Sequence, residues 1–264
     1  MAGFHSAGSR RRIGGGEPWV RPAPASRRYS ARVTKSVPTL AVVPAHNESA
    51  SVGEVVRRIA AVGYPVLVLD DGSTDATATK AAAAGATVVT MPVNLGVGGA
   101  MRAGFRYAVD HGYTRVVQVD ADLQHPPEDI PKLVEAADDG ADLVVGSRFA
   151  EGYRAERYRR VAMRGVAAIV SRMVGMKLDD VTSGFRVVSE PLLSRFADQY
   201  PAEYLGDTVE SLLQAHASGA TIAQVSVSMD PRAAGEPTSR IAAGGHLARL
   251  AVAVVAGKPQ RMSR

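Results

Sequence analysis

Apolar positions along the chain follow two alternating periods, starting at Thr39. Short runs rich in Val alternate with longer, alanine-rich segments in which apolar residues recur with the helical period. The runs predict strands at residues 39–43, 66–70, 87–91, 115–120 and 142–147. The intervening segments predict helices near residues 51–61, 74–84, 98–111 and 127–139, the first opened by a Ser51–Glu54 capping box. Such alternation is typical of an α/β domain with a mainly parallel, doubly wound sheet.

The pattern changes after Ser147. Residues 154–176 form a long basic and apolar segment, and residues 178–188 predict a loop that leads into a short strand. Further elements are predicted as helices near 191–197 and 208–218, a strand within 221–229, and a last apolar segment at 241–257. We therefore expect one folded domain over residues 38–240. A basic, disordered tail at 1–37 precedes it, and an amphipathic C-terminal helix with a tail at 241–264 follows it.

Composition narrows the function classes. The 264 residues include no cysteine, which excludes disulfides, thiolate catalysis and cysteine metal sites. The net charge of +5 is concentrated in the N-terminal tail, where Glu17 is the sole acid among residues 1–36, so we expect no nucleic-acid partner. No apolar run approaches the ~18–20 residues that a membrane-spanning helix needs. We expect a cytoplasmic protein, with contact at the inner face of the cell membrane left open.

Asp120-Ala121-Asp122 directly follows the predicted strand 115–120. Because residues i and i+2 of an extended chain point to the same side, the two carboxylates are expected to converge, with Gln124 adding a neutral oxygen. Oxygen ligands of this kind suit Mg²⁺ or Mn²⁺ shared with substrate phosphates. The alternative is a turn whose acids cap the helix that starts near Pro126 and Pro127.

Three further motifs stand at predicted strand ends, where open α/β sheets bind ligands. Two acids, Asp70 and Asp71, end the second strand, and buried acids are costly unless they bind something. Asn94-Leu95-Gly96 begins a glycine-rich loop that allows close backbone approach at a helix start, as in phosphate loops. Its place after the third strand argues against a dinucleotide fingerprint, because Pro44-Ala45-His46-Asn47-Glu48 follows the first strand instead. Tight turns are the alternative for each motif.

Together these motifs resemble the family 2 glycosyltransferases of the GT-A fold, a Rossmann-like architecture, and within them the dolichol- or polyprenyl-phosphate mannosyltransferase-like branch. The resemblance extends from about Thr39 to Arg240. It implies a nucleotide-diphosphate-sugar donor, held by Pro44, Ala45, Asn47, Glu48, Asp70, Asp71, Asn94, Gly96, Asp120, Ala121 and Asp122. It implies a Mg²⁺ or Mn²⁺ ion on Asp120, Asp122 and Gln124.

On the acceptor side, the resemblance assigns Arg148 of Gly146-Ser147-Arg148 to a phosphate. Thr182-Ser183-Gly184-Phe185-Arg186 resembles a family segment that lines the acceptor. The segment from Arg232 to Arg240 resembles a mobile loop that closes over the donor, so Arg186, Arg232 and Arg240 are further candidate phosphate contacts. A solvated loop is the alternative for the last segment.

The family inverts the anomeric centre by direct displacement, and a phosphate acceptor needs no general base, whereas a hydroxyl does. Asp207 and Glu210 are the candidate bases, and with Asp122 and Arg148 they complete the expected catalytic set. At i and i+3 they are expected to share a helix face, although acids at a helix start are also ordinary dipole partners. For His46, His125 and His216 a surface or packing role is favoured over metal binding.

The primary hypothesis is sugar transfer to a polyprenyl phosphate. The alternatives are transfer to a glycan or small-molecule hydroxyl, and a non-catalytic, membrane-recruited protein that binds nucleotide sugars. A sugar-phosphate nucleotidyltransferase is disfavoured because no glycine-rich, basic loop follows the first strand. The arginines of residues 154–164 precede an apolar run, which is consistent with a helix in the membrane interface. The alternative is a solvated face combined with a stripe of core residues.

Overall fold

The Val-rich runs form the strands of one sheet because their side chains are buried on both faces. The computed structural model describes residues 37–148, 157–201 and 207–230, with the side chains of the fifth helix described from residue 163 on. The strands are β1 (Thr39–Ala45), β2 (Val66–Asp70), β3 (Thr87–Thr90), β4 (Arg115–Gln118), β5 (Leu143–Ser147), β6 (Arg186–Ser189) and β7 (Ile222–Ser226). The helices are α1 (Val52–Ala61), α2 (Thr77–Ala83), α3 (Gly96–Asp110), α4 (Ile130–Asp138), α5 (Arg157–Val174), α6 (Leu192–Gln199) and α7 (Asp207–Ala217), with a 3-10 turn η1 (Pro127–Asp129) before α4.

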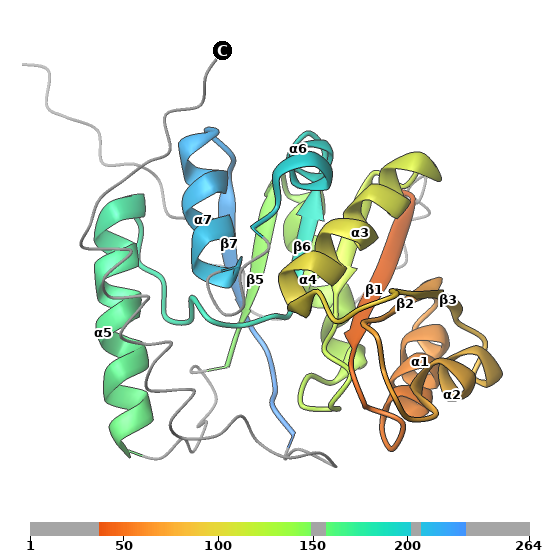
Figure 1. Cartoon of the computed structure of the whole chain (residues 1–264). Coiled ribbons are helices and arrows are strands. Elements are labelled where there is room, and N and C mark those ends of the chain that lie inside the picture. The colour runs from red at the N-terminus through yellow and green to blue at the C-terminus, as the bar shows by residue number, and fades with distance from the viewer. Residues whose placement is uncertain (1–36, 149–156, 202–206, 231–264) are drawn as a thin grey trace, which may run out of the picture. The chain divides into compact units, whose positions relative to one another are not determined.

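The strands are ordered β3-β2-β1-β4-β6-β5-β7 (Figure 1). All neighbouring pairs are parallel except those of β6, which runs antiparallel to both β4 and β5. Arg186, the first residue of β6, is opposite Gln118 at the end of β4 and Val145 in β5. The amino end of β6 therefore lies at the edge of the sheet where its neighbours have their carboxyl ends.

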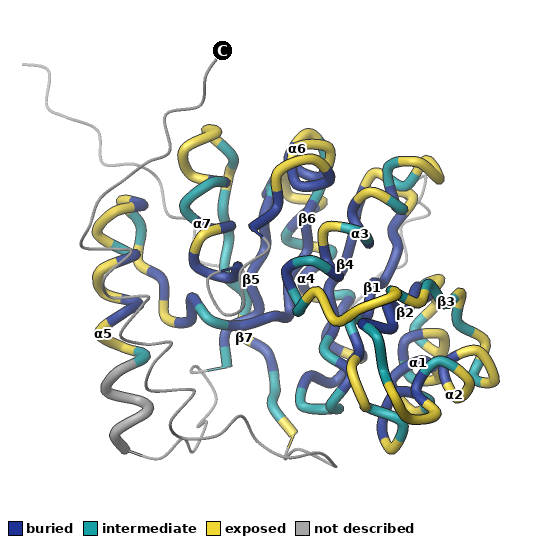
Figure 2. Tube along the Cα trace, in the orientation of Figure 1, coloured by how far each residue is buried: buried dark blue, intermediate teal, exposed yellow. Residues whose placement is uncertain are grey.

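Helices cover both faces of the sheet. Apolar residues of α1, α2 and α4 pack with one set of strand residues, and those of α3, α5, α6 and α7 pack with the set that points the other way. The inner strands β1, β2, β4, β5 and β6 are buried almost throughout, whereas the edge strands β3 and β7 are partly exposed. The helices alternate between buried and exposed residues (Figure 2). On the second face Phe105 of α3 lies 5.7 Å from Phe196 and 5.0 Å from Tyr200, ring centroid to ring centroid. The predicted doubly wound, mainly parallel sheet is confirmed.

Several local predictions need correction. The strand expected at 115–120 ends at Gln118, and the chain turns at Ala121. The capping box is not formed, since Ser51 has helical backbone angles and donates its hydroxyl to Glu48, while Glu54 pairs with Arg57. The predicted tail at 1–37 lies almost wholly outside the described residues. The predicted C-terminal helix and tail at 241–264 lie outside them as well. The same holds for Arg232 and Arg240, which precede that helix.

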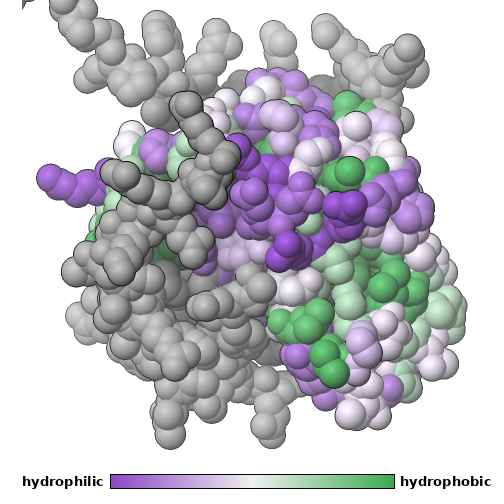
Figure 3. Space-filling model, turned by 45° about the horizontal axis from the view of Figure 1, so that its top comes forward, coloured by the Kyte–Doolittle hydropathy of each residue, from purple (hydrophilic) through white to green (hydrophobic). Residues whose placement is uncertain are grey.

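Figure 3 shows hydrophilic residues gathered in a band on one face, with apolar residues beside it. In the described ranges, five large hydrophobic side chains are exposed, namely Val37, Val93, Leu95, Ile169 and Met173. Across those ranges no helix has both the length and the apolar character that crossing a bilayer would require.

Candidate active site

The loops after β1 and β2 are joined to each other by hydrogen bonds. Ala45 pairs with Asp70 at the ends of the two strands, so the loops start side by side. The amide N–H of Asn47 donates to Ser73 Oγ at 2.9 Å, and Asn47 Oδ1 accepts from the Thr74 N–H at 2.9 Å. Asn47 adopts a φ of 56°, a left-handed conformation that asparagine tolerates better than most residues. The predicted nucleoside-binding segment at 44–48 is thus rigidly positioned and partly exposed at this edge.

Asp70 and Asp71 are buried, with 2% and 4% of their surface exposed. One oxygen of Asp71 accepts a hydrogen bond from the Leu95 N–H at 2.7 Å, and one oxygen of Asp70 accepts from the Ser73 N–H at 3.2 Å. Between the acids and the third loop, Gly72 has a φ of 67°, and a Cβ there would lie 2.9 Å from the backbone nitrogen of Asn94. These acids therefore hold the neighbouring loops in place, and direct contact with a nucleoside stays a prediction.

The glycine-rich loop after β3 leads directly into α3. Gly96, with a φ of 76°, is the first residue of the helix, two residues earlier than predicted. Its N–H donates to Asn94 Oδ1 at 2.9 Å. The structure therefore brings Asn94 and Gly96 to the same edge as the loops after β1 and β2. Their contact with a donor phosphate stays a prediction.

Asp120 and Asp122 follow β4, in the centre of the sheet. Both are partly exposed, and the Asp120 side chain is 35% exposed. Asp122 lies in a turn, where its Oδ1 accepts from the Gln124 N–H at 3.0 Å and Leu123 has a φ of 63°. The chain is not extended through Asp122, so the expectation that i and i+2 share a side does not apply there. Among the described residues no three His, Asp or Glu side chains converge as a complete metal site.

His125 lies behind Asp120 and is 2% exposed. Its ring stacks on Phe185 with centroids 5.2 Å apart, and its Nε2 lies 4.0 Å from Asp120 Oδ2. Burial is the main cause that lowers the pKa of His125 to about 4, and the positive charge of Arg148 is the second. The ring is therefore neutral near pH 7. This histidine has the packing role that the sequence favoured.

Arg148, predicted to meet a phosphate, forms a two-pronged ion pair with Asp180. Its Nε and Nη2 donate to the two Asp180 oxygens at 2.6 and 2.9 Å, and Nη2 also donates to Thr182 Oγ1 at 2.8 Å. Burial alone would raise the pKa of Asp180, but the hydrogen bonds and charge of Arg148 lower it below its ordinary value. Sequence reasoning missed Asp180, although an acid placed just before Thr182-Ser183-Gly184 was the available signal.

Arg186 was predicted as a phosphate contact, and the structure contradicts this. The side chain is 2% exposed, and its guanidinium donates to the carbonyl oxygens of Val181, Ser183 and Thr208 and to Ser211 Oγ, at 2.7–3.0 Å. These bonds tie the segment before β6 to the first turn of α7. The role of Arg186 is therefore structural, since its guanidinium is buried and donates its hydrogen bonds to oxygens of the protein.

The two candidate bases differ sharply in environment. Asp207, the first residue of α7, is 1% exposed, whereas Glu210, three residues further in the same helix, is exposed, so only Glu210 is open to solvent. Burial raises the pKa of Asp207 from its ordinary 3.8 to about 6, against the opposing charge of Arg186 and with a smaller contribution from Asp120. Asp207 Oδ2 has no hydrogen-bond partner within the described part of the chain.

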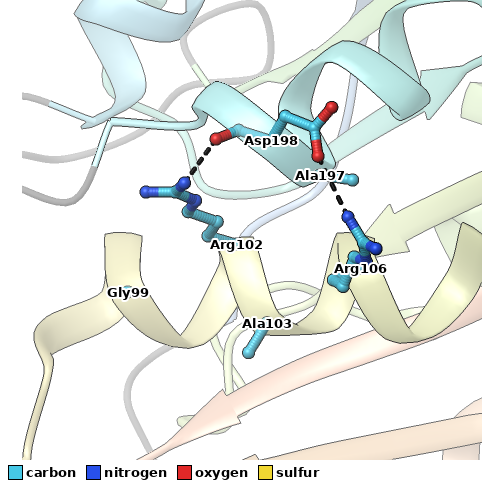
Figure 4. Close-up of a pocket in the computed structure, with 6 residues that line it drawn as sticks. All are labelled: Gly99, Arg102, Ala103, Arg106, Ala197 and Asp198. Carbon is cyan, nitrogen blue, oxygen red and sulfur yellow. Dashed lines mark hydrogen bonds and ion pairs between the residues drawn. The ribbon is translucent and has the colours of Figure 1, made fainter.

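A groove of about 400 Å³ lies apart from these residues, between α3 and α6 (Figure 4). Arg102 and Arg106 reach from α3 to Asp198, Arg102 to its backbone oxygen and Arg106 to its carboxylate at 3.0 Å. None of the predicted site residues lines the groove. We therefore assign the candidate active site to the carboxyl edge of β1, β2 and β4.

Residues 40–200 match the family described as Glycosyl transferase family 2. The chain belongs to this family. The polyprenol monophosphomannose synthase of Mycolicibacterium smegmatis is 33% identical over 168 residues, which cover 60% of this chain and 63% of that protein. The undecaprenyl-phosphate mannosyltransferase of Micrococcus luteus is 32% identical over 208 residues, which cover 75% of this chain and 85% of that protein. The match thus spans less than two thirds of the first relative and most of the second.

Solved structures share the fold. Glucosyl-3-phosphoglycerate synthase from Mycobacterium tuberculosis, crystallised with Mn²⁺, uridine diphosphate and glucosyl-3-phosphoglycerate, superposes with a TM-score of 0.69 at 25% identity. The alignment covers 86% of this chain and 82% of that one. The same synthase with Mg²⁺ and uridine diphosphate gives a TM-score of 0.68 at 24% identity. The family and the GT-A fold predicted from the motifs are confirmed.

Proposed function

We propose that this chain transfers a sugar from a nucleotide-diphosphate sugar to the phosphate of a polyprenyl lipid, with inversion at the anomeric carbon. The observation that carries the proposal is the meeting of three hydrogen-bonded loops beside Asp120 and Asp122, at one edge of a family 2 fold. Relatives at 32–33% identity are named for sugar transfer to polyprenol or undecaprenyl phosphate, which favours a lipid phosphate over other acceptors.

The acids of this edge fit a hard divalent cation. Asp120 and Asp122 offer carboxylate oxygens, and Gln124 offers an amide oxygen. Proteins usually bind Mg²⁺ through one or two carboxylates, and substrate phosphates complete the coordination. The buried side of the Asp120 carboxylate lies against Gly184, where a side chain would leave it no room. When bound, Mg²⁺ or Mn²⁺ would supply positive charge to the departing diphosphate.

On the donor side, the loops after β1, β2 and β3 would hold the nucleotide. The hydrogen bonds from the Thr74 N–H to Asn47 and from the Leu95 N–H to Asp71 fix these loops before any ligand arrives. A site that is already ordered loses less conformational entropy on binding. We therefore assign Asp70 and Asp71 chiefly to loop positioning, and the exposed parts of 44–48 and 94–96 to the donor.

On the acceptor side, Arg148 is the proposed contact for the lipid phosphate. Asp180 and Thr182 hold its guanidinium in one orientation, and 13% of the side chain remains exposed. A phosphate acceptor is already an anion, so the displacement needs no proton acceptor from this chain. Arg232 and Arg240 remain proposed phosphate contacts outside the described residues.

Helix α5 supports contact with a membrane surface, where such an acceptor would be found. No acid occurs between residues 157 and 177, and on the described part of the helix Arg164 and Arg172 are exposed beside Ile169 and Met173. Exposed apolar side chains flanked by cations are typical of helices that lie in the interface of anionic bilayers. Flotation with vesicles of phosphatidylglycerol should recover the protein, and Ile169→Glu with Met173→Glu should reduce the recovered fraction several-fold.

Asp207 supports a second candidate, transfer to a hydroxyl acceptor. With a pKa near 6 and a buried oxygen that lacks a partner in the described region, this carboxylate is ionised at pH 8 and able to accept a proton. Asp207→Asn separates the two candidates. Transfer to a polyprenyl phosphate should persist within a few-fold, whereas transfer to a hydroxyl should fall by about 10²–10⁴-fold.

The direct test begins with thermal unfolding in the presence of UDP, GDP or dTDP with Mn²⁺ or Mg²⁺, since a ligand that binds the native state raises its apparent stability. The nucleotide that raises the midpoint then defines the sugar donors to assay with polyprenyl phosphate in vesicles. The proposal predicts a labelled, chloroform-soluble product that is lost in EDTA and in Asp120→Ala. A panel without any metal-dependent shift would refute it, and nucleotide binding without turnover would favour a non-catalytic binding protein.

A further inference from the structure

Gly184 lies against the carboxylate of Asp120. A Cβ at this position would be 2.7 and 2.8 Å from the two carboxylate oxygens and 3.1 Å from Cγ, distances at which something must move. Gly184 is not among the residues with a left-handed φ, so its backbone conformation would accept alanine. The glycine is needed here for space and not for backbone geometry.

The backbone around Gly184 is fixed on both sides. The Gly146 N–H donates to the Phe185 carbonyl oxygen at 2.8 Å, and Arg186 Nε donates to the Ser183 carbonyl oxygen at 2.7 Å. Ser183 and Phe185 are themselves completely buried. A methyl group at Gly184 could not be accommodated by retreat of this segment, so the carboxylate would have to turn away.

The other side of the carboxylate faces His125. The imidazole is held by its stacking on Phe185, and its Nε2 is 4.0 Å from Asp120 Oδ2. The Asp120 side chain keeps 35% exposure. Gly184 and His125 therefore confine the part of the carboxylate that faces the protein, and the remainder is accessible to solvent.

We propose that Gly184 is a positioning residue, whose missing side chain sets the orientation in which Asp120 holds the cation of the donor complex. This role rests on the proposed function. Groups that orient a metal ligand commonly change metal affinity by 10–100-fold when they are altered. The orientation of one carboxylate is enough for such an effect when the protein supplies few ligands.

The first test measures Mn²⁺ binding by the loss of the free-ion EPR signal, with UDP and with GDP present. Gly184→Ala should bind Mn²⁺ about 10–100-fold more weakly than the wild type. Gly165→Ala on α5 is the matched control, because outside the backbone of its own helix no described atom lies within 4 Å of the Cβ it would add. This variant should bind Mn²⁺ as the wild type does. Wild-type affinity in a folded Gly184→Ala protein would overturn the positioning role.

The second test is a double-mutant cycle of urea denaturation in EDTA, which needs no metal and no activity. Gly184→Ala should lower the unfolding midpoint when Asp120 is present and leave it unchanged in Asp120→Ala, where the carboxylate is gone. An equal loss in both backgrounds, or failure of both alanine variants to fold, would overturn the contact. A wild type that binds no Mn²⁺ would overturn the proposed function and the positioning role in it, while the cycle still reports whether Gly184 and Asp120 meet.

Discussion

Asp207→Asn should stabilise the metal-free protein, and increasingly so as the pH rises. Burial raises the pKa of Asp207 from 3.8 to about 6, so the native state holds this proton more tightly than the unfolded chain does. The stability that the proton contributes is complete below about pH 4 and is lost as the pH rises through 6. Asparagine copies the neutral form and removes this loss.

The size of the effect follows from the pKa difference. About two pKa units, at ~1.36 kcal/mol each, correspond to about 3 kcal/mol between pH 4 and pH 8. For a domain of this size that is about 6–12 °C in melting temperature. His125 titrates in the same window with the opposite sign, because burial lowers its pKa from 6.5 to about 4 and the unfolded chain binds that proton more tightly. These two contributions oppose each other in the wild-type profile, so the difference between the two proteins is the informative quantity.

The assay is urea denaturation in EDTA at half-unit pH steps from 4.5 to 8. We expect the free energy of unfolding of Asp207→Asn to exceed that of the wild type by an amount that grows by about 2 kcal/mol from pH 4.5 to pH 8, since the rest of the change lies below pH 4.5. Glu210→Gln, on the same helix but exposed, is the control for the loss of a carboxylate at the surface. Parallel curves for wild type and Asp207→Asn would show that Asp207 ionises normally and would refute the reasoning.

Three further substitutions separate buried from exposed charges, each measured by urea denaturation at pH 7. Asp180→Ala leaves the guanidinium of Arg148 buried without its partner and should cost about 3–5 kcal/mol. Arg186→Met removes four hydrogen bonds and strands buried carbonyl oxygens, so we expect a loss of about 3 kcal/mol or more. Glu128→Gln breaks the pair with Arg58, but this pair lies at the surface and should cost less than about 1 kcal/mol. A large loss in Glu128→Gln, or a small one in the other two, would contradict this ranking.

The sequence predicted the strands well because hydrophobic period and Val content are local properties. The first five strands were placed to within two residues at either end, whereas the direction of β6 depends on its partners and has no local signal. The Ser51 capping box failed for a similar reason, since the hydroxyl found a competing acceptor in Glu48. Sequence supplies the candidates for a cap, and the surrounding structure selects among the available partners.

Among the candidate site residues, the strand-end motifs lie at one edge of the sheet as expected, but the contacts of Arg148 and Arg186 were not foreseeable from motif matching. The strand period held a clue for Arg186. This residue stands two positions before Val188, so its side chain leaves the strand on the same side as that core residue. A buried arginine is unusual, which is why the phosphate contact was the natural expectation. For Arg148 the deciding partner, Asp180, is 32 residues away in the sequence.

The reversed direction of β6 explains how one segment reaches both halves of the site. In the antiparallel pairing of β4 and β6, Gln118 is opposite Arg186, and two residues further the same register places Asp120 opposite Gly184. Opposed residues of an antiparallel pair have their side chains on one face about 4.5–5.5 Å apart, which accounts for the crowding at Gly184. On its other side β6 borders β5, and Arg148 after that strand meets Asp180. A parallel strand would begin at the opposite edge of the sheet, so it could not bring residues 180–184 beside both Asp120 and Arg148.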